Sequence, residues 1–257
     1  MNSYAKRIAI FFYGVLSYAI FLATFIYSIG FVGNLPFAAR TIDGEPLLPF
    51  WQALSIDVLL LGLFAVQHSV MARPAFKRWW TRYVPVEAER STYVLFSSLV
   101  LSLLYAFWQP LGGEVWQIDN HSGRLVMAAA FGFGWALVLY STVLINHFDL
   151  FGLRQVGLQL LGKPYTPLEF QTPAAYRLVR HPLYAGWLLC FWATPSMCAA
   201  HLLFAVLTSV YILIAIQLEE RDLIAQHPEY RDYRRQVPML LPRFSRRGKT
   251  AVRGETA

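Results

Sequence analysis

Charged residues are scarce in this chain. Asp, Glu, Lys and Arg make up 14% of its 257 residues, and apolar residues make up 56%, whereas a soluble globular domain carries roughly a quarter charged residues. The apolar residues gather in blocks of about 20, the helical length that crosses a hydrocarbon core roughly 30 Å thick. This composition excludes an ordinary soluble domain and predicts an integral membrane protein in contact with the lipid bilayer.

Residues that bind metals or form disulfides are also few. The two cysteines, Cys190 and Cys198, lie within apolar sequence and provide neither a disulfide framework nor a ligand spacing. No two of the six histidines stand three or four residues apart, so the spacing of a helix-borne zinc site is missing and no metal is expected. Residues 132–134 begin like a dinucleotide fingerprint, but Leu137 replaces its third glycine, which disfavours a soluble Rossmann domain.

The features of a nucleic-acid-binding protein are missing as well. The net charge is +7, but the Lys and Arg residues stand between the apolar blocks and in the tail, without aromatic residues interleaved along a soluble domain. We expect no nucleic-acid partner.

Four apolar blocks are each long enough for one membrane-spanning helix. They cover residues 8–32, 51–71, 92–108 and 125–148. A fifth block, residues 183–217, can cross twice only if both arms are short, and Pro195 interrupts it near the middle, which predicts a helical hairpin with its turn near Pro195. The predicted fold class is all-α: a polytopic membrane helical bundle with four full spans, a C-terminal hairpin and a cytoplasmic amphipathic helix.

The sequence beyond the hairpin is polar. Apolar residues at helical spacing stand among charges in residues 218–233, which predicts the amphipathic helix, stopped or bent around Pro228. Residues 245–257 predict a basic, disordered tail attracted to anionic headgroups. We therefore divide the chain into a bundle, residues 1–148, a C-terminal segment, residues 149–244, and the tail, residues 245–257.

Basic residues also indicate how the chain is oriented. Residues 73–90 hold five Lys or Arg residues, whereas residues 33–50 and 109–124 hold one each. The positive-inside rule then places residues 73–90 in the cytoplasm. The same alternation places both termini and residues 149–182 there, so that all the unusual polar sequence lies on one face of a membrane that we expect to be a bacterial inner membrane.

A composite motif occupies the last third of the chain. It consists of the run from Arg180 to Gly186, Arg-His-Pro-Leu-Tyr-Ala-Gly, the Glu219-Glu220 pair, and a Tyr-x-x-Tyr segment that ends in Val-Pro. A hairpin brings its two ends together, so the Arg-His-Pro turn and the Glu pair should line one site. This motif closely resembles the isoprenylcysteine carboxyl methyltransferase superfamily of membrane methyltransferases. Residues 146–156 and 67–73 further resemble its bacterial methanethiol S-methyltransferase branch, so that the resemblance extends over most of the chain but not the first span.

The resemblance implies a reaction and the residues that carry it. It implies methyl transfer from S-adenosylmethionine to a small thiol, methanethiol, within the C-terminal segment. In the family the motif positions contact the cofactor, which implies the cofactor-binding set Gln155, Arg180, His181, Pro182, Leu183, Tyr184, Glu219 and Glu220. Arg180 can pair with the carboxylate of the donor in a forked geometry, and it is also counted as catalytic.

A thiol must lose its proton to become a good nucleophile. His147 stands at the cytoplasmic end of the fourth predicted span, and Tyr211 stands about two helical turns before Glu219. We therefore predict His147 and Tyr211 as catalytic residues that relay this proton through water.

Three alternatives remain open at this stage. The acceptor can be another thiol or an isoprenylcysteine carboxylate. The chain can be a sterol-type membrane reductase, which shares a related C-terminal pattern, or a transporter or sensor without enzymatic activity, for which broken helices in repeated halves are typical.

Overall fold

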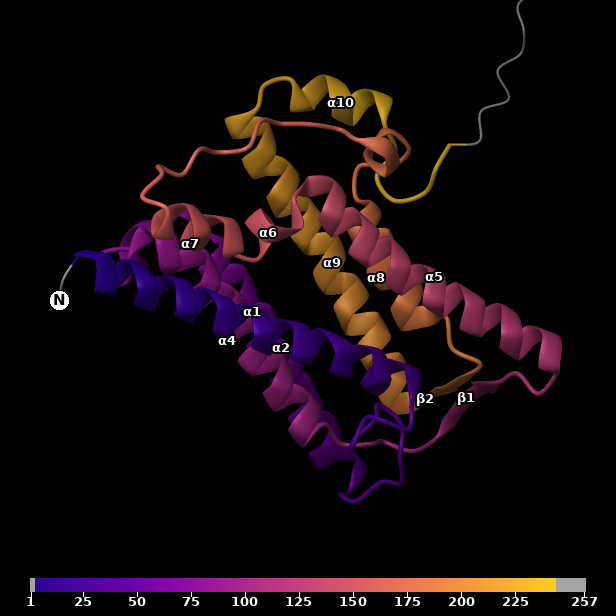
Figure 1. Ribbon diagram of the computed structural model, residues 1–257. Coiled ribbons are helices and arrows are strands. Elements are labelled where there is room, and N and C mark those ends of the chain that lie inside the picture. The colour runs from indigo at the N-terminus through magenta and orange to yellow at the C-terminus, as the bar shows by residue number, and fades with distance from the viewer. Residues whose placement is uncertain (1–2, 244–257) are drawn as a thin grey trace, which may run out of the picture.

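A computed structural model describes residues 3–243 of the chain (Figure 1). In this range five helices are long and apolar enough to cross a membrane: α1 (Ser3–Gly33), α2 (Phe50–Ala72), α4 (Val86–Phe107), α5 (His121–Ile145) and α9 (Ala199–Gln226). The predicted all-α polytopic bundle and its four spans are confirmed. The predicted basic tail, residues 245–257, lies outside the described residues.

The predicted hairpin consists of two unequal arms. Its first arm, α8 (Pro182–Trp192), has 11 residues and is therefore only about 16 Å long, too short to cross the hydrocarbon core alone. After the turn at Pro195 the chain forms β2 (Ser196–Cys198), which pairs antiparallel with β1 (Glu114–Gln117), and then enters α9. The two strands lie at the end of the bundle opposite α10, as Figure 1 shows.

The end of α9 differs from the sequence prediction. Residues 218–226 continue α9 without a break, and they do not begin a separate amphipathic helix. They contain neither Gly nor Pro, so the helix propagates out of the apolar region. The break comes at residues 227–229, around Pro228 as predicted, and α10 (Tyr230–Gln236) follows.

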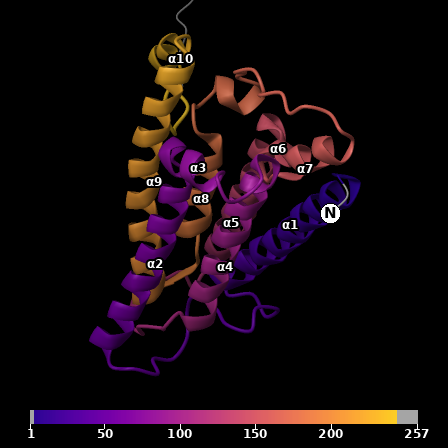
Figure 2. The same cartoon turned by 90° about the vertical axis from the view of Figure 1, so that its left-hand side faces the viewer.

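Several short helices that the sequence did not predict lie toward the same end of the molecule as α10. They are α3 (Pro74–Trp80), α6 (His147–Leu150), α7 (Leu153–Leu160) and the 3₁₀ turn η1 (Ala174–Arg177). Figure 1 places α6, α7 and α10 toward one end of the molecule, away from β1 and β2, and Figure 2 places α3 toward the same end as these three helices. The segments that were predicted to share one face of the membrane therefore share one end of the bundle.

Close packing of α5 against α8 holds the first part of the composite motif in place. A Cβ atom at Gly186 would lie 2.9 Å from the carbonyl oxygen of Gly134, and one at Gly134 would lie 2.8 Å from Cys190 Sγ. The two backbones thus approach at a distance that only glycine permits. Trp135 packs edge-on against Trp187, with ring centroids 5.1 Å apart, and extends the same contact into the core.

Candidate active site

A buried carboxylate joins the two ends of the hairpin. Glu220 is 1% exposed, and its Oε1 accepts a hydrogen bond from Arg180 Nε at 2.7 Å and lies 3.0 Å from His181 Nε2. Its Oε2 lies 3.0 Å from Arg234 Nε, and the Tyr230 hydroxyl points to Oε1 at 3.5 Å. We call these five residues the Glu220 cluster.

Backbone hydrogen bonds fasten residues 230–239, which comprise α10 and the residues after it, to the start of α8. The N–H groups of Arg180 and His181 donate to the carbonyls of Pro238 at 2.8 Å and Met239 at 3.1 Å. Arg180 Nη1 donates to two further carbonyls of the same segment. Pro182 stands in the first turn of α8, where a missing N–H leaves no helical hydrogen bond unmade. The structure thus brings the Arg-His-Pro turn beside the Glu pair.

Glu219 lies in a different environment from Glu220. It is half-buried, and its Oε2 accepts a hydrogen bond from the Tyr184 hydroxyl at 2.9 Å. Within residues 3–243 no other side chain bonds to it. Leu183, which precedes Tyr184, packs against the hydrophobic core. Glu219 is therefore the carboxylate of the pair that can still accept a hydrogen bond from a ligand.

Two phenols beside the cluster stay neutral near pH 7. The Tyr233 hydroxyl donates to the Tyr176 carbonyl. Burial raises the pKa of Tyr233 to about 12. Burial, followed by the nearby Glu219 carboxylate, raises the pKa of Tyr176. Both hydroxyls therefore keep their protons and are not bases.

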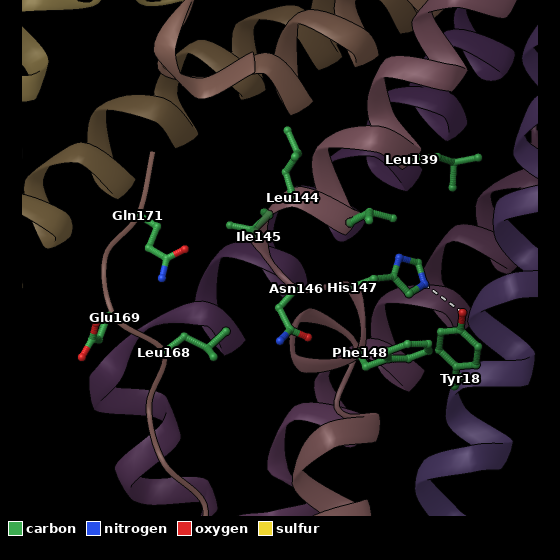
Figure 3. Close-up of a pocket in the computed structure, with 11 residues that line it drawn as sticks. Tyr18, Leu139, Leu144, Ile145, Asn146, His147, Phe148, Leu168, Glu169 and Gln171 are labelled. Carbon is green, nitrogen blue, oxygen red and sulfur yellow. Dashed lines mark hydrogen bonds between the residues drawn. The ribbon is translucent and has the colours of Figure 1, made fainter. Parts of the chain in front are cut away.

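A cavity of about 850 Å³ lies at the same end of the bundle. Figure 3 shows its walls: the end of α5, the first residues of α6, Tyr18 from α1, and the loop around Gln171. The lining residues are Tyr18, Leu139, Val143, Leu144, Ile145, Asn146, His147, Phe148, Leu168, Glu169 and Gln171. The volume falls within the roughly 300–1,000 Å³ of pockets that hold drug-sized ligands.

His147 enters this cavity because α5 ends abruptly before it. Asn146 has φ 90°, in the left-handed region, and its side chain accepts a hydrogen bond from the Asp149 N–H, which caps α6. His147 Nδ1 lies 2.9 Å from Thr142 Oγ1, and its Nε2 lies 2.8 Å from the Tyr18 hydroxyl. Burial lowers the pKa of His147 below its usual value, so the ring is a neutral imidazole at pH 7.

The loop at residues 168–171 connects the cavity to the Glu220 cluster. Leu168 and Gln171 line the cavity and point toward it in Figure 3. Phe170 points to the other side, where its ring centroid lies 5.6 Å from that of Tyr230 and 5.8 Å from that of Tyr233. A ligand in the cavity therefore contacts a loop that rests on the cluster.

Two predicted site residues lie elsewhere. Gln155 is in α7, where its Nε2 donates to the Asp149 carbonyl at 3.1 Å and its Oε1 is buried without a partner in the described part of the chain. The Tyr211 hydroxyl accepts from Ser69 at 3.2 Å, with its ring near that of His68. Among the described residues no hydrogen bond joins Tyr211 directly to His147, and the relay between them through water stays a prediction.

Sequence reasoning missed Tyr18, Thr142 and Arg234. Tyr18 and His147 are 129 residues apart, and a tyrosine or threonine within an apolar span is ordinary on its own. Arg234 is one of several basic residues in α10. Each of the three residues can be recognised only in the folded chain, where its hydrogen-bond or ion-pair partner lies beside it.

Comparison with known proteins places the chain in a family. The chain is 56% identical over 242 residues to a methanethiol S-methyltransferase from Crocosphaera subtropica, with 94% of each chain covered. It is 54% identical over 238 residues to a methanethiol S-methyltransferase from Mycobacterium tuberculosis, which covers 92% of this chain and 97% of the relative. Nurim from Rattus norvegicus is 33% identical over 180 residues, or 66% of this chain and 68% of Nurim.

No protein-family model and no solved structure matches the sequence. The two bacterial relatives nevertheless align over more than nine tenths of this chain, including the motif whose geometry is described above. The chain belongs to the methanethiol S-methyltransferase family.

Proposed function

We propose that this protein transfers the methyl group of S-adenosylmethionine to methanethiol and produces dimethyl sulfide and S-adenosylhomocysteine. The observation that supports this proposal most directly is that Arg180 and His181 form one cluster with Glu220, which stands about 40 residues further along the chain. A loop links that cluster to a cavity of ligand size. The names of the bacterial relatives support the same substrate.

The residues present fit S-adenosylmethionine, which supplies a methyl group on a positively charged sulfur. Glu219 keeps an oxygen for the ribose hydroxyls or the ammonium group. Arg180 Nη2 makes no hydrogen bond within residues 3–243, so it remains for the carboxylate, while Glu220 holds the guanidinium through Nε. The backbone and rings from His181 through Pro182 and Leu183 to Tyr184 would hold the adenine.

Gln155, His147 and Tyr211 complete the predicted site. Gln155 donates to the Asp149 carbonyl, and its Oε1, which has no partner in the described part of the chain, remains for the cofactor. His147 accepts the thiol proton, a task for which its lowered pKa keeps the ring neutral; such assistance is typically worth a factor of about 10² to 10⁴. Tyr211 stays a prediction as a second participant, reached through Ser69.

The proposal includes the orientation of the protein. The bundle end that holds the cluster and the cavity faces the cytoplasm, where S-adenosylmethionine is made, and both termini lie on that side of a bacterial inner membrane. The five basic residues among residues 73–90 support this orientation. These residues include α3, which lies toward that end of the bundle (Figure 2).

Headspace gas analysis tests the reaction. Purified protein in lipid is given methanethiol and S-adenosylmethionine whose methyl group carries deuterium. We expect dimethyl sulfide with one deuterated methyl group. Absence of this product, or calorimetric binding of a nicotinamide nucleotide in place of S-adenosylmethionine, would contradict the proposal.

Calorimetry tests the binding residues separately. Glu219→Gln removes the accessible charge, and a charge-assisted contact is worth about 1.5–3 kcal/mol, so affinity for S-adenosylmethionine should fall by roughly 10- to 150-fold. Glu45→Gln is the matched control, because Glu45 is an exposed carboxylate in the loop between α1 and α2, at the opposite end of the bundle. Equal affinities in the two variants would remove Glu219 from the site.

A further inference from the structure

The protons around His147 can be assigned from hydrogen bonds alone. Thr142 Oγ1 lies 2.7 Å from the Leu139 carbonyl and 2.9 Å from His147 Nδ1. A carbonyl oxygen only accepts, and a hydroxyl has a single proton. The Thr142 proton therefore goes to Leu139, and its oxygen accepts the Nδ1–H of His147. A neutral His147 then carries no proton on Nε2.

This assignment also fixes the proton of Tyr18. Since Nε2 is an acceptor, the Tyr18 hydroxyl donates to it across 2.8 Å. The phenol oxygen keeps its lone pairs for another donor, and Tyr18 lines the cavity together with His147. Figure 3 shows the bond between the two side chains at the cavity wall. A thiol S–H in the cavity can donate to Tyr18 in turn.

We propose, on the basis of the function proposed above, that Tyr18 of the first span is the residue that receives the proton of the thiol, with His147 as the final acceptor and Thr142 as the residue that positions it. The S–H bond breaks, and its proton moves to the Tyr18 oxygen. The Tyr18 hydroxyl proton moves to His147 Nε2. The thiol sulfur forms a bond to the methyl carbon as the bond between that carbon and the donor sulfur breaks.

The atoms and charges of this step balance. One cation, the sulfonium donor, enters the reaction, and one cation, the imidazolium of His147, remains at its end beside two neutral thioethers. Deprotonation in solution returns the imidazole for the next cycle. Because burial lowers the pKa of His147, this return is favoured at neutral pH.

Within residues 3–243, few other charged groups lie near His147. Glu169 is on the cavity wall. Asp149, two residues along α6, is paired with Arg154 at 2.8 Å and accepts a hydrogen bond from Tyr165, so its charge is already balanced. Arg90 of α4 donates to the Leu150 carbonyl. Tyr18 is thus the group through which a proton reaches the ring.

Removing one hydroxyl tests this role. Tyr18→Phe keeps the ring contacts with His147 and Phe151 and should lower kcat at pH 7 by at least about tenfold, with the affinity for S-adenosylmethionine measured by calorimetry unchanged. The loss should shrink as the pH approaches that of thiol ionisation, well above neutrality. Tyr13→Phe is the matched control, because Tyr13 is on the same helix and loses a comparable bond, to Thr92 at 2.9 Å; it should retain its activity.

Nitrogen-15 spectra of histidine-labelled protein test the geometry without turnover. The His147 signals, identified by their absence in His147→Gln, should show a proton on Nδ1 in the wild type and in Thr142→Ser. In Thr142→Val the acceptor is lost, so the proton should move to Nε2 and kcat should fall. A wild-type ring protonated on Nε2 would overturn the assignment.

The two proposals fail in different ways. Wild-type protein that makes dimethyl sulfide while Tyr18→Phe turns over equally fast at pH 7 would overturn the relay alone. Wild-type protein that binds S-adenosylmethionine but makes no dimethyl sulfide would overturn the proposed acceptor, and the relay with it.

Discussion

Replacing Glu220 by glutamine should release residues 230–239 from α8 and α9. The side chain keeps its shape and one acceptor oxygen but loses the charge that meets Arg180 and His181, whose side chains are 10% and 4% exposed. Breaking a buried ion pair costs about 3–5 kcal/mol. The pair with Arg234, 46% exposed, adds little, since exposed pairs contribute up to about 1 kcal/mol. Because an acceptor oxygen remains, we expect the loss of stability to be at the low end of this range, about 3 kcal/mol. This corresponds to roughly a 100-fold increase in the equilibrium constant for local opening of α10.

Hydrogen exchange of the α10 amides in detergent micelles measures this opening. Asp232→Asn makes the same chemical change in α10, where Asp232 and its partner Arg235 are 74% and 82% exposed, and it should leave exchange unchanged. Equal exchange rates in Glu220→Gln and Asp232→Asn would refute the reasoning, because they would show that the Glu220 cluster does not hold the segment in place.

Three further predictions follow from packing, charge and orientation. Gly186→Ala puts a Cβ 2.9 Å from the Gly134 carbonyl and should lower the unfolding free energy by about 1–3 kcal/mol, whereas Gly132→Ala, with nothing within 4 Å, should not; denaturant titration compares them. Burial lowers the pKa of His147, so protonation removes its acceptor nitrogen only below the usual value of about 6.5, and the acidic limb of a kcat profile should lie below that pH; a limb above it would contradict the role of His147. A reporter fused after Ala257 should be active only if it works in the cytoplasm; periplasmic activity would reverse the topology.

The spans could be predicted from the sequence because lipid imposes a length on them. Blocks of about 20 apolar residues have no other stable arrangement in a bilayer, and Pro195 marks the turn of the hairpin because it cannot continue a helix. The end of α9 could not be predicted in the same way. Residues 218–226 have a composition that suits either a continued helix or a separate one, and the sequence shows no stop before Pro228.

The site could be predicted only in part, for a related reason. The Arg-His-Pro turn and the Glu pair are recognisable because several residue types recur at fixed spacing. The partner of His147 is not, because Tyr18 comes from a helix that carries none of the motif and lies 129 residues away. Hydrogen bonds between spans depend on which helix faces contact one another in the packed bundle. Hydropathy gives no information on these contacts.

The two adjacent glutamates show what a motif leaves undetermined. Glu219 and Glu220 are the same residue type in one helix, and successive side chains point about 100° apart. One direction leads to Arg180 and His181, where the carboxylate is 1% exposed and held by buried partners. The other leads to the Tyr184 hydroxyl and leaves an oxygen for a ligand. A charge that is fully paired inside the protein is costly to redirect, so Glu220 holds Arg180 in place, and Glu219 is the member of the pair that can change partners when the donor binds.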